Sequence, residues 1–184
     1  MHLCPWSNDL PPLLINPYSL PMSYLPNIES RLAKPAEAQV LAEMSRQLAE
    51  SGLSWTWKPM RILSMINNPE TVVIVARTRV ELARFAIIEF HNSHAHFNLL
   101  AVAGDKRREG IASALLDWLE NSAGVAGLDR IELEIRHNNE RARGFYKVHA
   151  CEEVAMVPGY YEGREHALRM IHYLVSPDIP EKRP

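Results

Sequence analysis

A short basic turn followed by a glycine and an apolar helix is the part of this sequence best suited to bind a phosphate group. Residues 99–116 read LLAVAGDKRREGIASALL, so three cations precede Gly110 where a helix is expected to begin. The first backbone N–H groups of a helix have no partner within it, and the helix dipole adds about half a positive charge there. Gly110 lets an anion approach the backbone closely. The pattern predicts an anion site, with an ordinary solvated turn as the alternative.

The elements that must position this turn alternate between strand and helix from residue 28 to residue 175. We expect strands at 28–33, 71–76, 82–90, 95–103, 131–136, 152–157 and 166–174, and helices at 35–51, 58–66 and 110–122, with a further helix from Asn138 or Asn139 to about His149. A loop with Pro158, Gly159 and Gly163 joins the last two strands. This order predicts an α/β fold with a mixed sheet. Residues 1–27 form a proline-rich arm and residues 176–184 a polar tail.

Composition limits the classes of protein to consider. The 184 residues fit one domain with a full core, and the formal charge of −2 provides no basic field for nucleic acid. No apolar run approaches the ~18 residues of a membrane span, and Met1–Leu10 lack the features of a signal peptide. Cys4 and Cys151 are too far apart in sequence to suggest a secreted disulfide framework. We therefore expect a cytoplasmic protein with no nucleic-acid or membrane partner.

Other residues with chemical potential have simpler explanations. His91, His94 and His96 cluster in sequence, but a structural zinc site normally has four ligands, so we expect a polar edge and no metal. Cys151 has apolar neighbours, which favours a buried, inert thiol over a reactive one. For three residues near the second helix, the sequence does not decide between a place in an acceptor pocket, in the core or in a dimer contact: Trp55, Trp57 and Met60.

Two motifs together resemble the GNAT acetyltransferases. Residues 107–112, RREGIA, match the (Q/R)-x-x-G-x-(G/A) signature of that family, and they lie between a strand ending AV and a helix ending LL. Residues 133–146, LEIRHNNERARGFY, resemble the second family stretch, roughly L-E-V-R-x-x-N-x-x-A-x-x-x-Y. The segment with Tyr160, Tyr161 and Glu165 is similar to the ribosomal-protein-alanine N-acetyltransferase branch.

The resemblance implies the GNAT acyl-CoA N-acyltransferase fold, with acetyl-CoA as the cosubstrate. It also implies which residues bind this molecule. The pyrophosphate would lie against the backbone of Arg107, Arg108, Glu109, Gly110, Ile111 and Ala112. The pantetheine arm would lie between the strand edge at Leu100, Ala101 and Val102 and, on the far side, Asn139.

The resemblance assigns the chemical step to Glu134 and Tyr146. Glu134 would accept a proton from the attacking amine, directly or through water, and Tyr146 would donate one to the leaving thiolate. An alkylammonium is not a nucleophile until it loses a proton, and burial can raise the pKa of a carboxylate toward the useful range. The alternatives are that Glu134 belongs to the polar face of an alternating strand and that Tyr146 is a packed aromatic residue.

The acceptor amine is less constrained. Tyr160 and Tyr161 are suited to hold an extended peptide, which favours a protein N-terminus; the alternative is that they only close a hairpin. An α-amine also has an unperturbed pKa of about 7.7–8.0 against about 10.4 for lysine, so more of it is neutral near pH 7. A small amine such as a polyamine or an antibiotic, and a catalytically silent coenzyme-A-binding regulatory domain, are the rival interpretations. Either a monomer or a homodimer is compatible with the sequence.

Overall fold

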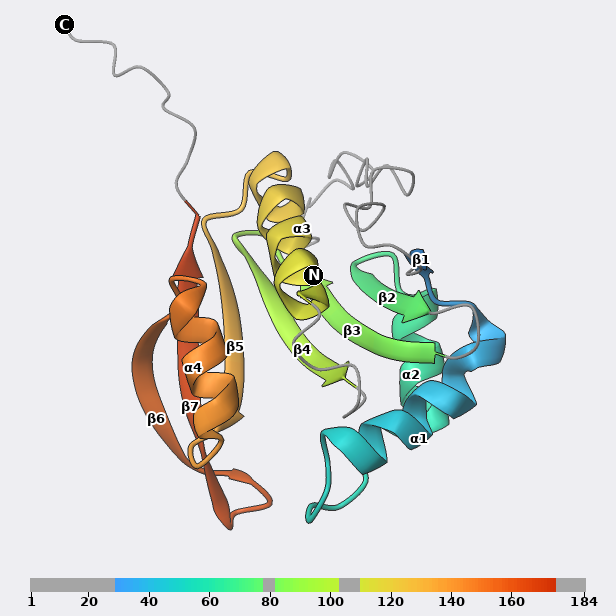
Figure 1. The fold of residues 1–184 in the computed structure, drawn as a ribbon, viewed down its shortest axis with the longest axis horizontal. Coiled ribbons are helices and arrows are strands. Elements are labelled where there is room, and N and C mark those ends of the chain that lie inside the picture. The colour runs from blue at the N-terminus through green and yellow to red at the C-terminus, as the bar shows by residue number, and fades with distance from the viewer. Residues whose placement is uncertain (1–28, 78–81, 103–109, 175–184) are drawn as a thin grey trace, which may run out of the picture.

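A computed structural model of the chain describes residues 29–77, 82–102 and 110–174. The proline-rich arm and the polar tail expected at the two ends lie outside these residues. The described elements are β1 (Glu29–Leu32), a short 3-10 helix (Pro35–Glu37), α1 (Ala38–Leu48), α2 (Pro59–Asn67), β2 (Thr71–Arg77), β3 (Leu82–Phe90), β4 (His94–Val102), α3 (Ile111–Val125), β5 (Arg130–Arg136), α4 (Glu140–Val148), β6 (Glu152–Tyr161) and β7 (Glu165–Tyr173). Their order confirms the expected alternation (Figure 1).

The strands of the described region form one mixed sheet, as expected. This seven-stranded sheet has the order β1-β2-β3-β4-β5-β7-β6. Strands β4 and β5 pair in parallel, and the other neighbouring strands pair antiparallel. A parallel pair requires a crossover connection, and α3 provides it between β4 and β5. The anion site predicted at the start of α3 therefore lies in the connection between the two parallel strands.

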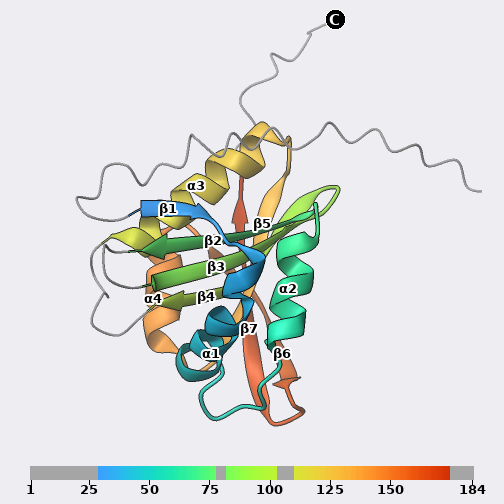
Figure 2. The same cartoon turned by 90° about the vertical axis from the view of Figure 1, so that its right-hand side faces the viewer.

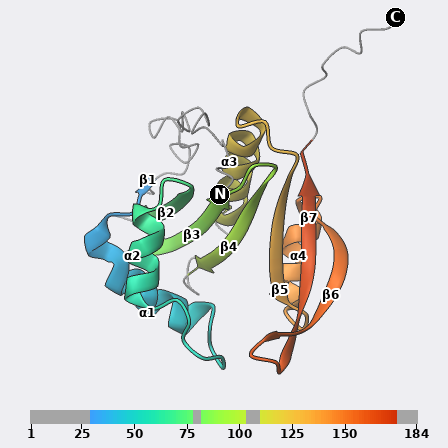
Figure 3. The same cartoon turned by 180° about the vertical axis from the view of Figure 1, so that it is seen from behind.

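Helices cover the two faces of the sheet unequally. One apolar cluster joins α3 and α4 to β2, β3, β4, β5 and β7, and it includes Leu119, Ile131 and Leu133. A second cluster joins α1 and α2 to β2, β3 and β4, and it includes Leu41 and Ile62. Figures 2 and 3 show α1 and α2 beside β1–β4, while β5, β7 and β6 have no helix on that face. The polar residues of β5 are therefore not covered by a helix.

A bulge in β4 changes which residues face each side of the sheet. Leu99 is paired with Ile87 on β3, and Phe97 is paired with Ile88, so Asn98 is an extra residue on β4. Before the bulge, Phe97 packs in the cluster with α3 and α4; after it, Leu99 packs in the cluster with α1 and α2. An extra residue shifts the two-residue period by one and produces this reversal.

The parallel pairing of β4 with β5 ends at the same place. The register runs from the pair His94–Arg130 to the pair Phe97–Leu133 and stops there, although β4 continues to Val102 and β5 to Arg136. Beyond the bulge the two strands diverge, as Figure 1 shows. Their facing backbone edges are thus available to a ligand, because backbone N–H and C=O groups require hydrogen-bond partners.

The end of β6 differs from expectation. The strand extends to Tyr161, whereas residues 158–161 were expected to lie in a loop. The pairing with β7 is interrupted between Val157 and Tyr161, so this part of β6 is a bulged strand end. Gly159 has a φ of 63°, and a Cβ there would lie 3.2 Å from the Cα of Gly163. The proline and glycine of this segment, Pro158 and Gly159, are typical of a loop. In the structure they interrupt the pairing with β7 but do not end the strand.

Candidate active site

A cleft of about 1470 Å³ opens where β4 and β5 diverge. Its walls come from β4, β5, α4, the start of α3, the connection between α1 and α2, and the end of β6. Nine residues predicted from the sequence line it: Leu100, Val102, Gly110, Ala112, Glu134, Asn139, Tyr146, Tyr160 and Tyr161. Residues from the two sequence motifs, at 107–112 and 133–146, thus share one cavity, which is what the predicted site requires.

Other predicted residues lie elsewhere or outside the described part of the chain. Ala101 is buried in the cluster under α1 and α2 and does not line the cleft. Ile111 is the first residue of α3, so its backbone belongs to the helix start. Arg107, Arg108 and Glu109 lie outside the described residues.

The start of α3 has the backbone geometry of an anion site. Gly110 is the N-cap of this 15-residue helix and has a φ of 75°, a left-handed conformation that favours glycine. Among the described residues, and apart from Gly110 and its immediate neighbours in the chain, no atom lies within 4 Å of the position where its Cβ would be. Gly110 and Ala112 both line the cleft. The positive end of the helix dipole, at the N–H groups that have no partner within the helix, therefore faces the cavity.

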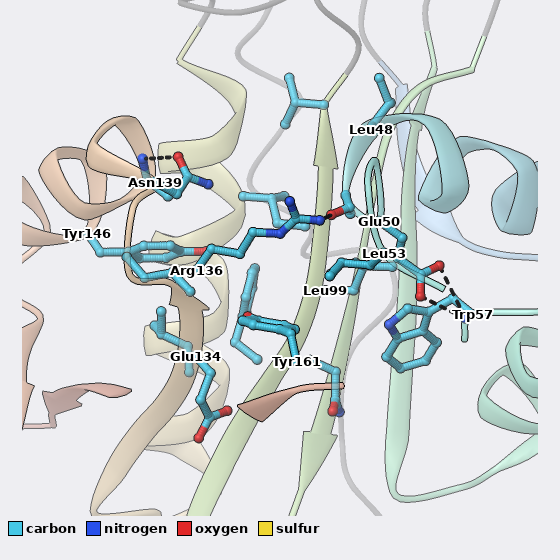
Figure 4. Close-up of a pocket in the computed structure, with 18 of the residues that line it drawn as sticks. Leu48, Glu50, Leu53, Trp57, Leu99, Glu134, Arg136, Asn139, Tyr146 and Tyr161 are labelled. Atoms are coloured by element: carbon cyan, nitrogen blue, oxygen red, sulfur yellow. Dashed lines mark hydrogen bonds between the residues drawn. The ribbon is translucent and has the colours of Figure 1, made fainter. Parts of the chain in front are cut away.

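Asn139 and Tyr146 reach the cleft from α4. Asn139 is the N-cap of this helix, and its Oδ1 accepts a hydrogen bond of 3.1 Å from the backbone N–H of Ala142. This confirms the expected cap. Tyr146 lies two turns further along the helix and is 5% exposed. Its ring makes edge contacts with Phe97 and Phe145, at centroid distances of 6.4 and 5.1 Å. Both residues come from the α3 and α4 side of the sheet (Figure 4).

The Tyr146 hydroxyl is held in its protonated form. Burial raises its pKa above the ordinary value, because the phenolate is poorly solvated there; Cys151 and Tyr161 add smaller upward contributions. The hydroxyl makes no hydrogen bond to another described residue, although the ring lines the cleft. A protonated, unengaged hydroxyl in this position is suited to donate a proton to a ligand.

Glu134 lies on the opposite face of the sheet. Ile131, Leu133 and Ile135 pack under α3 and α4, so Glu134 points to the face that lacks a helix. Its side chain is 5% exposed. Its Oε1 accepts a hydrogen bond of 2.8 Å from Nε of Arg169, and its Oε2 lies 2.8 Å from Nε2 of His96. The alternation seen in the sequence placed this residue correctly.

The expected rise in the pKa of Glu134 was wrong. Burial does push this pKa upward, but the hydrogen bonds and positive charge of His96 and Arg169 outweigh burial and leave it below the ordinary value. The partners lie on β4 and β7, which the two-residue alternation of β5 does not reveal. A carboxylate held in this way is ionised at neutral pH and is, by itself, a weak base.

The paired tyrosines border the same face. The Tyr160 hydroxyl donates to Oε2 of Glu134 at 3.4 Å, and the ring lies edge-on to Tyr161 at a centroid distance of 4.9 Å. Burial raises the pKa of both residues, to about 12 for Tyr161. Figure 4 shows Tyr161 between Glu134 and the side chains of the α1–α2 connection. The tyrosines therefore do more than close the β6–β7 hairpin, because they form part of the cleft wall.

The connection between α1 and α2 forms the remaining wall and is organised by Glu50. This carboxylate is 7% exposed and accepts hydrogen bonds from the Thr56 hydroxyl and from the backbone N–H groups of Thr56, at 2.7 Å, and Trp57, at 3.2 Å. Its second oxygen accepts from the Ser45 hydroxyl at 3.0 Å. The guanidinium of Arg61 stacks on the Trp57 ring at 3.8 Å. One carboxylate thereby fixes a segment that has no regular secondary structure.

Two contacts join this wall to β5 and to the turn between β6 and β7. Arg136 on β5 donates to the backbone carbonyl of Ser51 at 2.7 Å, and the backbone N–H of Ser54 donates to the carboxylate of Glu162. Both contacts span more than 80 residues of sequence. They bridge the mouth of the cleft on the face where Glu134 lies, so this mouth has a defined shape.

The structure shows where several side chains lie whose surroundings the sequence does not determine. Trp57 is buried and lines the cleft, Trp55 packs on the cluster under α1 and α2, and Met60 is 75% exposed. Cys151 is buried, and burial raises its pKa to about 12, which agrees with an inert thiol. His91 and His94 stack on one another at 4.6 Å.

Sequence reasoning missed the roles of His96 and Arg169. His96 was expected at a polar edge, yet it contacts Glu134 and lines the cleft. Arg169 comes from β7 and has no motif around it. What brings both residues to Glu134 is the register of the strands, since His96 pairs with Glu132 and Arg169 pairs with Glu134. That register follows from the three-dimensional pairing and cannot be read from either strand alone.

Comparison with known proteins agrees with this geometry. The profile of the acetyltransferase (GNAT) family matches residues 38–150. The chain belongs to this family. It is 39% identical over 79 residues to an uncharacterized N-acetyltransferase of Methanocaldococcus jannaschii, over 42% of this chain and 51% of the relative. It is 31% identical over 93 residues to the ribosomal protein bS18-alanine N-acetyltransferase of Escherichia coli, over 49% of this chain and 63% of the relative.

Solved structures share the GNAT fold. The ribosomal-protein-S18-alanine N-acetyltransferase of E. coli superposes with a TM-score of 0.71 at 20% identity, over 85% of this chain and 99% of that one. Ard1 of Thermoplasma volcanium superposes with a TM-score of 0.69 at 23% identity, over 81% and 99%. The chain spans less than two-thirds of the length of the curated relatives above, whereas these solved structures match over nearly their whole length. The expected fold family is confirmed. Among the described helices, none is long and apolar enough to cross a membrane.

The role of Glu50 gives a prediction about the cleft wall. Replacing Glu50 with Ala leaves the buried N–H of Trp57 without its acceptor, which we expect to lower the free energy of unfolding by about 1.5–3 kcal/mol. Urea unfolding and hydrogen exchange at the Thr56 and Trp57 amides measure the effect. Glu43→Ala, an exposed change on α1, is the control. Equal stability of the two variants would show that Glu50 does not organise this wall.

Proposed function

We propose that this chain transfers the acetyl group of acetyl-CoA to an amine, with a protein N-terminal α-amine as the acceptor. The observation that carries the proposal is the cleft between the diverging strands, which Tyr146 reaches from one face of the sheet and Glu134 from the other. Both groups required for amine acylation thus meet one cavity. Membership of the GNAT family supports the use of acetyl-CoA.

The residues present suit this cosubstrate. The helix start at Gly110 combines open space, a left-handed glycine and the positive end of a 15-residue helix dipole, which suits a pyrophosphate. The backbone edge of β4 beyond the bulge, at residues 99–102, is not paired with β5 and is available to the amide groups of a pantetheine arm. Asn139 borders the other side of the gap. Its Oδ1 is occupied by the cap, which leaves the side-chain amide N–H groups as the donors that Asn139 can offer a ligand.

The faces of the sheet separate the two proton transfers. An amine that approaches from the open face gives up a proton near Glu134, and its lone pair attacks the thioester carbonyl in the gap between the strands. The C–N bond forms and the C–S bond breaks. The thiolate leaves on the α4 side, where Tyr146 donates a proton to it. A positioned donor stabilises charge that develops in the transition state without needing to bind the ground state.

A protein N-terminus suits the acceptor side of the cleft. Tyr160, Tyr161 and Trp57 provide aromatic walls along which an extended chain can lie, and the contacts of Arg136 and Glu162 define the mouth. The relative in E. coli is named as an alanine N-acetyltransferase that acts on ribosomal protein bS18, which supports a protein acceptor here. The presence of both Glu134 and Tyr146 in one cavity favours an active enzyme over a silent binding domain.

Binding of acetyl-CoA is expected to depend on Gly110. Gly110→Glu places a side chain and a negative charge where the pyrophosphate would lie, so calorimetry should show the loss of acetyl-CoA binding. Gly127→Glu is the matched control, because Gly127 also has a positive φ of 72° and open surroundings but lies at the other end of α3. Unchanged affinity in the folded Gly110 variant would place the pyrophosphate elsewhere.

Turnover is expected to depend on the Tyr146 hydroxyl. Tyr146→Phe should lower kcat by about 10²–10⁴-fold, the usual contribution of a positioned proton donor, with little change in the Kd for acetyl-CoA. Steady-state kinetics and calorimetry separate the two quantities. Tyr173→Phe removes an exposed hydroxyl from β7 and serves as the control. Full activity of Tyr146→Phe would reduce this residue to a packing role.

The acceptor class is tested by a panel of amines. We expect acetylation of peptides with a free N-terminal Ala or Ser, and little reaction with the same peptides when the N-terminus is blocked and a lysine is free. Mass spectrometry locates the acetyl group. Reaction only with the blocked peptides or with spermidine would contradict the N-terminal acceptor and leave the acetyltransferase assignment intact.

A further inference from the structure

The surroundings of Glu134 determine how readily it can accept a proton. Glu134 is ionised but weakly basic, because Arg169 and His96 stabilise its charge. A general base works best when its pKa lies near the operating pH. Glu134 alone therefore fits the role poorly, and its closest titratable partner must be considered with it.

His96 is held at both ring nitrogens. Its Nδ1 lies 3.1 Å from Oδ1 of Asn98, and its Nε2 lies 2.8 Å from Oε2 of Glu134. The side-chain amide of Asn98 donates to Glu89 at 3.3 Å, which leaves its Oδ1 to accept from His96. The Nδ1 of His96 therefore carries a proton in both charge states of the ring.

The second contact then requires one more proton. A neutral imidazole with its proton on Nδ1 presents a lone pair at Nε2, and an ionised Glu134 presents only lone pairs. Two acceptors 2.8 Å apart are stable only when a proton lies between them. When that proton leaves, the lone pair at Nε2 faces the carboxylate and raises its affinity for a new proton.

We propose that His96 and Glu134 act as one base, in which Glu134 takes the proton from the acceptor amine and His96 receives it at Nε2 and releases it to solvent. This inference rests on the proposed acetyl transfer. For each acetyl group moved, the ammonium loses two protons; one passes through His96 to solvent, and the other balances the proton that the coenzyme A thiolate takes. The His96 side chain is 23% exposed, so the ring connects the buried carboxylate to water.

The surroundings of His96 favour this role. The hydrogen bond to Glu134 is the largest influence on its pKa and raises it; burial acts in the opposite direction but does not cancel the rise. The titratable and charged groups around it come from each neighbouring element: Glu89 on β3, His94 on β4, Glu132 and Glu134 on β5, Tyr160 on β6, Arg169 on β7 and, beyond Tyr160, Arg61 on α2. Carboxylates outnumber guanidinium groups in this set, so the surroundings favour the protonated ring.

The bulge at Asn98 makes the arrangement possible. His96 lies before the bulge and faces the uncovered side of β5, as Glu134 does. Asn98 is the extra residue, and its side chain reaches both His96 and Glu89. His96 is thus positioned by the same irregularity that separates β4 from β5.

The proposal is tested by combining NMR titration with pH-dependent kinetics. In the full chain, the His96 ring should titrate above pH 6.5, and Glu134→Gln should lower that pKa because the carboxylate is lost. With saturating substrates, kcat should rise with pH through the same pKa. His96→Gln should remove this step, shift the acidic limb to lower pH and lower the plateau by about 10–100-fold, at or just below the usual contribution of acid–base catalysis.

The control is His94→Gln, which removes a histidine from the same strand without touching Glu134. Its pH profile should match that of the unmodified chain. A His96 pKa at or below 6.5, or one that does not fall in Glu134→Gln, would overturn the shared base whatever the turnover. An unchanged acidic limb in His96→Gln would overturn the proton path while acetyl transfer stands. Absence of transfer to every acceptor by the unmodified chain would instead overturn the proposed function and the proton path with it.

Discussion

The separation of β4 from β5 is the constraint on which the rest of this structure depends. Two parallel strands in the middle of a sheet normally pair along their whole length, because unpaired backbone groups are costly when buried. Here the pairing stops at Phe97 and Leu133, directly before the bulge at Asn98. The gap exposes backbone edges inside the molecule and lets a cavity pass from one face of the sheet to the other. A ligand with amide groups along an extended arm satisfies such edges.

The gap also explains how residues from opposite faces take part in one reaction. Tyr146 lies on α4 and packs against the sheet among apolar neighbours, and burial keeps its hydroxyl protonated. Glu134 lies on the face that α1 and α2 leave uncovered, among charged partners that keep it ionised. If both groups lay on the same face, each would alter the charge state of the other. Placing the sheet between them allows an apolar environment for the acid and a polar one for the base.

Local sequence patterns predicted the elements and much of the cavity, and they failed where distant strands meet. The alternation of residues 131–136 placed Glu134 on the correct face, and Gly110 and Asn139 marked the starts of two helices. The charge partners of Glu134 lie 38 and 35 residues away on other strands, so the direction of its pKa shift was not accessible from β5 alone. The bulge at Asn98 was also hidden, because its effect is seen only against the register of β3.

The most direct test of this account is a crystal structure of the chain with a bisubstrate analogue in which coenzyme A is joined to the N-terminal nitrogen of a peptide. The pyrophosphate is expected to lie at the start of α3, and the pantetheine arm is expected to pass between β4 and Asn139. The sulfur should then lie on the Tyr146 side of the sheet, and the peptide nitrogen on the Glu134 side, next to His96. A peptide that enters from the face of α3 and α4, or a pantetheine arm that does not pass between β4 and β5, would contradict the central claim.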